Sequence, residues 1–63
     1  MEYRIRRFRE EQQMTQQELA IKSGVSRATI SGLESGLITV TTTDTLIKIA
    51  TALDKKVSDI FLA

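Results

Sequence analysis

The sequence predicts a compact all-α domain built from five short helices. Helix-capping residues, glycines at the expected helix ends and apolar residues spaced three or four apart support this fold class. The β-prone run at residues 37–45, LITVTTTDT, is too short and isolated to form a sheet, so we interpret it as a loop. At 63 residues, one domain near the lower size limit for independent folding is expected.

The first predicted helix runs from about residue 2 to residue 13. Ile5 and Phe8 lie three residues apart and place Arg9 on the same core-facing stripe. We expect Arg9 to form an ion pair with Glu34, because an unpaired buried charge is strongly destabilising. The alternative is that both charges extend to solvent.

The first ten residues are rich in arginine. Two interpretations of this cluster remain open. The arginines form part of a nucleic-acid footprint, or they belong to a solvated helix whose acidic residues balance them. The arginines are Arg4, Arg6, Arg7 and Arg9, and the acidic residues are Glu2, Glu10 and Glu11.

Residues 15–36 predict two short helices joined by a tight turn. Thr15 and Glu18 form a capping box, so a helix is expected to start at residue 16, with residues 19 and 20 facing inward. Gly24 permits the left-handed turn that ends this helix. Ser26 caps the second helix, which is expected to end at Gly36.

The second helix of this pair has two contrasting faces. Helical spacing predicts that Ile30, Leu33 and Leu37 point inward. The opposite side carries mostly small side chains and one long hydrogen-bond donor, which is typical of a helix that enters a DNA groove. This outer face consists of Arg27, Ala28, Ser31, Gly32 and Ser35.

Two further helices are expected after the loop. Thr42 is the predicted N-cap of a fourth helix, with Asp44 in its first turn, and Asp54 ends it because Asp tolerates left-handed geometry. Its apolar side consists of Leu46, Ile47, Ile49, Ala50 and Leu53, and Val57, Ile60 and Phe61 predict a short fifth helix.

The composition argues against several functional classes. The chain contains no Cys and no His, which excludes disulfides, most zinc sites and the commonest general base, and we expect no cofactor and no metal. The carboxylates form no recognisable pair and no base activates Ser or Thr, so we do not expect an enzyme. No apolar run is long enough to cross a membrane, and the lack of cysteine is compatible with a reducing cytoplasm.

These residues closely resemble the lambda-repressor-like (XRE-type) helix-turn-helix family of Cro and phage repressors. The resemblance covers essentially the whole chain. It rests on Gln16, Leu19, Ala20, Gly24, Val25, Ser26, Ile30, Leu33, Glu34 and Gly36, followed by Leu46, Ile49, Ala50, Leu53, Val57, Ile60 and Phe61.

The resemblance implies a five-helix domain spanning residues 1–63, whose third helix lies in the major groove of double-stranded DNA. Gln16 matches a residue that grips a phosphate, and Ser26 matches a contact at the start of the third helix. The positions of Arg27, Ala28 and Ser31 match side chains that meet base edges, and Arg9 with Glu34 matches an internal ion pair of the family.

The chain departs from the family pattern at two places. Gly32 stands where many relatives carry a long polar base reader; it indicates either close approach of the backbone to DNA or a position no longer used for reading. The following loop carries Leu37, Ile38 and Val40 in place of basic residues. We expect Leu37 to pack inside. If Ile38 and Val40 are exposed, we expect them to contact a protein and not DNA.

The leading hypothesis is a sequence-specific transcriptional regulator, a repressor that binds a palindromic operator as a homodimer through the loop and the apolar residues 60–62. The resemblance further implies a cytoplasmic, nucleoid-associated protein of bacterial or phage origin. The alternative is an antitoxin-like protein or adaptor, whose main partner is another protein and whose DNA binding is secondary.

Overall fold

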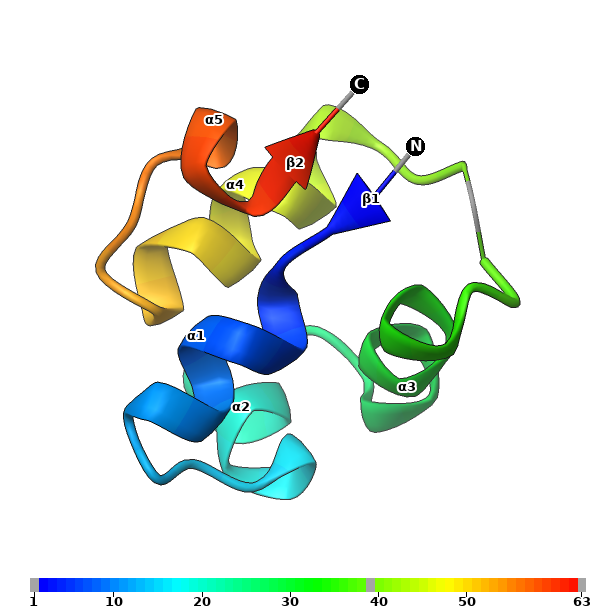
Figure 1. The fold of residues 1–63 in the computed structure, drawn as a ribbon. Coiled ribbons are helices and arrows are strands. Elements are labelled where there is room, and N and C mark those ends of the chain that lie inside the picture. Colours follow the sequence, from blue (N-terminus) through cyan, green and yellow to red (C-terminus); the bar gives the residue numbers. More distant parts are fainter. Residues whose placement is uncertain (1, 39, 63) are drawn as a thin grey trace.

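Within residues 2–38 and 40–62, which the computed structural model describes, five helices surround one apolar core (Figure 1). They are α1 (Ile5–Glu11), α2 (Gln16–Ser23), α3 (Arg27–Ser35), α4 (Thr43–Ala52) and α5 (Val57–Ile60). Two-residue strands, β1 (Glu2–Tyr3) and β2 (Phe61–Leu62), pair antiparallel and hold the two ends of the chain together. The predicted all-α fold, with α2 and α3 forming the helix-turn-helix, is confirmed.

Side-chain caps and left-handed residues set the helix boundaries as predicted. Thr15 Oγ1 accepts a hydrogen bond from Glu18 N at 3.0 Å, and Thr15 N donates to Glu18 Oε1 at 3.0 Å, which completes the capping box. Ser26 and Thr42 cap α3 and α4 through their hydroxyls, which accept from Thr29 N and Thr45 N. The predicted left-handed residues at the ends of α2, α3 and α4 are Gly24 (φ 75°), Gly36 (φ 86°) and Asp54 (φ 57°).

Helix α1 is shorter than the predicted span of residues 2–13. At its start, Arg4 N donates to Ile60 O at 2.7 Å, and the preceding residues join the strand pair with β2. At its end, Gln13 adopts φ 55° and Met14 N donates to Arg9 O at 3.0 Å, which closes the helix as a Schellman motif. The predicted fifth helix likewise ends at Ile60 because Phe61 enters β2.

The core lies between the helices and consists of aliphatic side chains. Its buried members are Ile5, Leu19, Val25, Ile30, Leu33, Leu46, Ile49, Ala50, Ala52, Leu53 and Ile60. Two apolar residues differ from their predicted places, because Ile47 is exposed on α4 and Leu37 is 87% exposed. Leu37 follows the left-handed Gly36, so the helical spacing that predicted an inward position no longer applies there. Its neighbour Ile38 packs against the core instead.

Candidate nucleic-acid interface

Helix α3 lies at the edge of the domain, with one side against the core and the other open to solvent (Figure 1). Ile30 and Leu33 are buried as predicted. The exposed side carries Arg27, Ala28, Ser31 and Ser35. Since helix α2 packs against both α3 and α4, the outer face of α3 is held on a rigid support.

Gly32 does not belong to this exposed face. It is buried, and the side chain of Ile38 covers it. A Cβ atom built on Gly32 would lie 2.6 Å from Ile38 Cγ1, and Ile38 N donates to Gly32 O at 3.0 Å. The predicted place of Gly32 on the exposed outer face of α3 is therefore wrong, while its assignment to the DNA-contacting residues stays a prediction. Because Gly32 has no Cβ, the side chain of Ile38 from the following loop can pack directly on the helix. Glycine has no side chain whose polarity could have indicated whether this position is buried.

The remaining polar residues of the face differ in what their side chains already bind. Ser26 Oγ caps α3, accepting from Thr29 N at 3.2 Å. Ser35 Oγ donates to Gly32 O at 3.3 Å at the other end of the helix. Among the described residues, Arg27 and Ser31 have no side-chain hydrogen bond or ion pair, so these two keep their full bonding capacity for a ligand.

A partly buried polar network lies directly beside this face. Arg9 Nε and Nη2 donate to the two carboxylate oxygens of Glu34 at 2.9 and 3.0 Å, which is the expected ion pair. The side chains are only 12% and 5% exposed, so the alternative that both extend to solvent is wrong. The hydrogen bond to Glu34 raises the pKa of Arg9, against the opposing effect of burial. The guanidinium therefore stays charged throughout the neutral range.

The network also holds the start of α2. Arg9 Nη1 donates to Met14 O at 2.7 Å, and Gln16 Nε2 donates to Glu34 Oε1 at 3.2 Å. The contact between Gln16 and Glu34 was not predicted, because hydrogen bonds between polar side chains leave no spacing signal in a sequence. This hydrogen bond holds the side-chain amide of Gln16 in place, and the family resemblance assigns that amide to a phosphate contact.

The arginine cluster of α1 is largely balanced within the domain. Arg6 pairs with Glu10 and Arg7 with Glu11, each at 3.3 Å on exposed surface. Together with the Arg9–Glu34 pair, these contacts give three of the four arginines an acidic partner in the free protein, and both interpretations of the cluster stay open.

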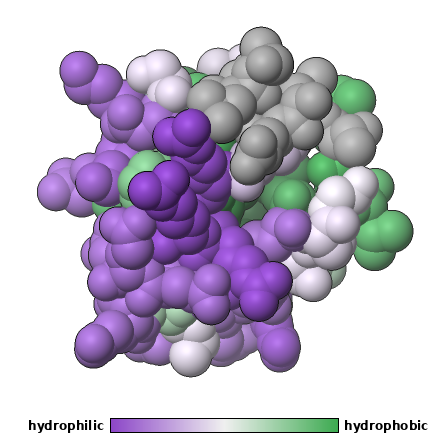
Figure 2. All heavy atoms as spheres, viewed as in Figure 1, coloured by the Kyte–Doolittle hydropathy of each residue, from purple (hydrophilic) through white to green (hydrophobic). Residues whose placement is uncertain are grey.

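The two most exposed large apolar side chains among the described residues lie in the loop after α3, where Leu37 is 87% and Val40 is 82% exposed. Ile21 on α2, at 73%, is the next most exposed. Figure 2 shows hydrophobic surface at the edge of the domain beyond α3, while the rest of this view is mainly hydrophilic. Ile38, predicted to contact a protein if it is exposed, is partly buried on α3, and Ile60 is fully buried. Of the proposed contact residues, the side chains of residues 61 and 62 lie outside those described.

In the part of the chain that the structure describes, no group of His, Cys, Asp and Glu side chains is arranged to hold a metal ion. No helix among the same residues has the length and hydropathy needed to cross a membrane.

Comparison with known proteins agrees with this architecture. A family model described as helix-turn-helix matches residues 5–60, from the first residue of α1 to the last residue of α5. A search of characterised proteins gave no significant match. The family match covers the whole helical part of the chain, including the network beside α3.

Proposed function

Because the chain belongs to the lambda-repressor-like helix-turn-helix family of DNA-binding regulators, we propose that it inserts α3 into the major groove and reads a specific sequence. The observation that carries this proposal is the outer face of α3, which is exposed, carries mostly small side chains and contains Arg27, unpaired among the residues that the structure describes. We further propose that residues 1–63 act as a single domain for this purpose.

Each residue of the face has a distinct proposed role. Arg27 donates two hydrogen bonds to O6 and N7 of a guanine, and the methyl of Ala28 contacts a thymine methyl. Ser31 bonds a base edge or a nearby phosphate. Gln16 and Ser26, at the N-terminal ends of α2 and α3, bind backbone phosphates on either side of the reading residues.

We propose that the regulator is a repressor that acts by occupying its operator as a homodimer. One copy of α3 reads only a few base pairs, and a palindromic site lets a second copy double the contacts. The exposed Leu37 and Val40 support a protein contact in the loop after α3. Sedimentation showing a monomer at high micromolar concentration, and one copy per DNA molecule, would remove the dimer.

Selection of bound sequences from a random DNA pool tests sequence reading directly. We expect an enriched motif that contains a guanine, and loss of that preference in Arg27→Ala. Lys22→Ala is the matched control, because Lys22 is also exposed and has no ion pair among the described residues, but lies on α2. Equal binding by Arg27→Ala and the wild type would contradict the proposed base contact.

The same exposed loop favours a second candidate function. A domain with Leu37 and Val40 on its surface fits an antitoxin-like protein or adaptor whose main ligand is another protein. Failure of the pool to enrich any motif, at low salt and with folded protein, would favour this candidate over the repressor.

A further inference from the structure

A polar hollow of about 230 Å³ opens between α1, α2 and α3, next to the exposed face of α3. Its lining residues are Arg6, Arg9, Gln16, Ser31, Glu34 and Ser35. We propose that this hollow binds one phosphate of the DNA backbone, with Arg6 as the cationic ligand and Glu34 as a positioning residue for Gln16. The inference rests on the proposed function and adds Arg6 and Glu34 to the DNA contact.

The charges inside the hollow favour an anion despite the presence of Glu34. The Glu34 carboxylate accepts three hydrogen bonds, two from Arg9 at 2.9 and 3.0 Å and one from Gln16 at 3.2 Å. The positive charge of Arg9 therefore neutralises the Glu34 carboxylate, and both carboxylate oxygens already accept hydrogen bonds. An approaching phosphate meets a compensated ion pair rather than a free carboxylate.

Gln16 is the first phosphate ligand of the hollow. Its amide nitrogen carries two hydrogens, and one of them is directed to Glu34 Oε1. That bond holds the amide at the start of α2 and leaves the second hydrogen for an incoming oxygen. Glu34 therefore makes no contact with the DNA itself. It acts by orienting the side chain of Gln16.

Arg6 supplies the positive charge. It lies three residues before Arg9, on the side of α1 that faces the hollow, and its side chain is 69% exposed. Its present partner is Glu10, in an exposed (i, i+4) pair at 3.3 Å. Such pairs are weak, so a phosphate, which accepts two parallel hydrogen bonds from a guanidinium, can replace the carboxylate.

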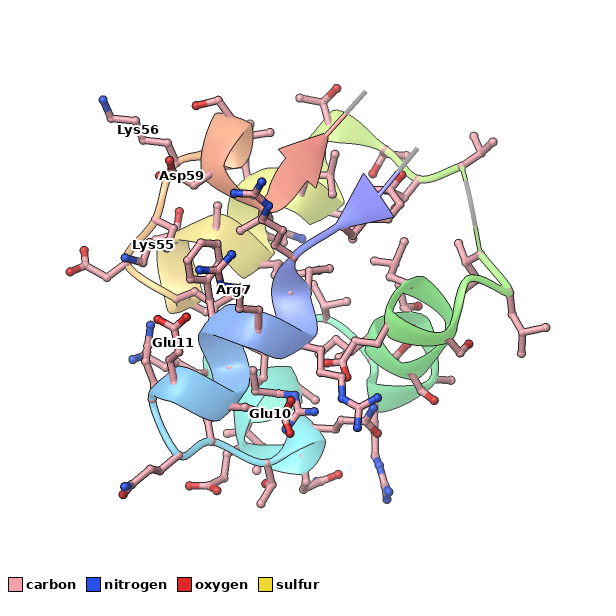
Figure 3. All side chains as sticks on the ribbon, viewed as in Figure 1. Arg7, Glu10, Glu11, Lys55, Lys56 and Asp59 are labelled. Atoms are coloured by element: carbon pink, nitrogen blue, oxygen red, sulfur yellow. The ribbon has the colours of Figure 1, made fainter. Side chains whose placement is uncertain are left out.

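The neighbouring Arg7 provides a closely matched control. Its pair with Glu11 has the same 3.3 Å distance and the same spacing, and its side chain is 66% exposed. Arg7 does not line the hollow. Figure 3 shows Arg7 and Glu11 on the side of α1 nearer Lys55, while Glu10 lies on the other side of the helix in this view.

The experiment measures operator affinity of the full chain between 50 and 200 mM salt, using the sequence selected from the random pool. The salt slope is the slope of the logarithm of affinity against the logarithm of salt concentration, and each lost phosphate contact reduces its magnitude by about 0.9. Over this fourfold rise in salt, the affinity of the wild type should therefore fall by a factor about 3.5 times larger than the affinity of Arg6→Gln, per bound copy. At low salt, Arg6→Gln should bind roughly tenfold more weakly than the wild type. Arg7→Gln should keep the wild-type slope.

Two further comparisons test the arrangement within the hollow. Glu10→Gln should raise affinity by freeing Arg6, whereas Glu11→Gln should leave it near the wild-type value. Gln16→Ala should weaken binding in the wild type but not in the double variant Arg9→Met with Glu34→Leu, where the amide has lost its anchor. Circular dichroism and urea unfolding confirm that each variant is folded before binding is measured.

Equal slopes for Arg6→Gln and Arg7→Gln, in a protein that binds its operator and depends on Arg27, would overturn the inference while leaving the proposed function intact. An undiminished effect of Gln16→Ala in the double variant would remove the role of Glu34. Absence of specific DNA binding by the wild type would instead refute the proposed function itself.

Discussion

Adding one methyl group at Gly32 tests whether the loop after α3 is packed on the helix as described. The new Cβ would lie 2.6 Å from Ile38 Cγ1 and 3.3 Å from Ile38 Cβ, so the isoleucine must move. In an exposed helix Gly→Ala gains about 1 kcal/mol of stability, while forcing extra volume into a packed site costs about 1–3 kcal/mol. We therefore expect Gly32→Ala to lower the free energy of unfolding by about 0–2 kcal/mol.

The double variant with Ile38→Ala separates the two effects. That change removes Ile38 Cγ1 and leaves Ile38 Cβ, at 3.3 Å, as the nearest atom, and a shift of a few tenths of an ångström relieves this contact. In this background Gly32→Ala should recover its helical gain of about 1 kcal/mol. The coupling free energy between the two positions should therefore be about 1–3 kcal/mol.

Urea unfolding of the four proteins measures this coupling. Ser31→Ala is the control on the same helix, because Ser31 is exposed and has no described side-chain partner, and its effect should be equal in both backgrounds. If Gly32→Ala changes the free energy of unfolding equally with Ile38 and with Ala at position 38, the packing of Ile38 on α3 is refuted.

Four other substitutions should change the free energy of unfolding in ways set by their contacts, and urea unfolding measures each. Thr15→Ala removes the capping box and should cost about 1 kcal/mol; a loss below 0.3 kcal/mol would contradict the cap. Glu34→Leu alone should cost about 3–5 kcal/mol because it leaves Arg9 buried and unpaired, whereas combining it with Arg9→Met should restore most of that loss. Gly24→Ala should cost about 1–2 kcal/mol through its left-handed φ of 75° alone, since no atom lies within 4 Å of a Cβ there. Leu37→Ser should change stability by less than about 0.5 kcal/mol, and a larger loss would show that Leu37 packs on the domain.

The features that the sequence predicted well are those decided by neighbouring residues. The capping box at Thr15 and the left-handed ends at Gly24 and Asp54 depend on atoms within a few positions, so local chemistry identifies them. The start of α1 depends instead on Ile60, whose carbonyl accepts the hydrogen bond from Arg4 N. No local pattern near residue 4 carries information about a partner at the other end of the chain.

The candidate site shows the same division, with a consequence for specificity. Burial of Gly32 restricts the proposed reading face of α3 mainly to Arg27, Ala28 and Ser31, since the Ser35 hydroxyl is bonded to the helix end. One bidentate arginine discriminates between bases by about 1–3 kcal/mol, whereas specific binding typically exceeds non-specific binding by about 4–10 kcal/mol. A single copy with this face falls short of that range, and two copies on a symmetric site reach its lower part. The small reading face therefore supports the proposal that recognition requires a second copy.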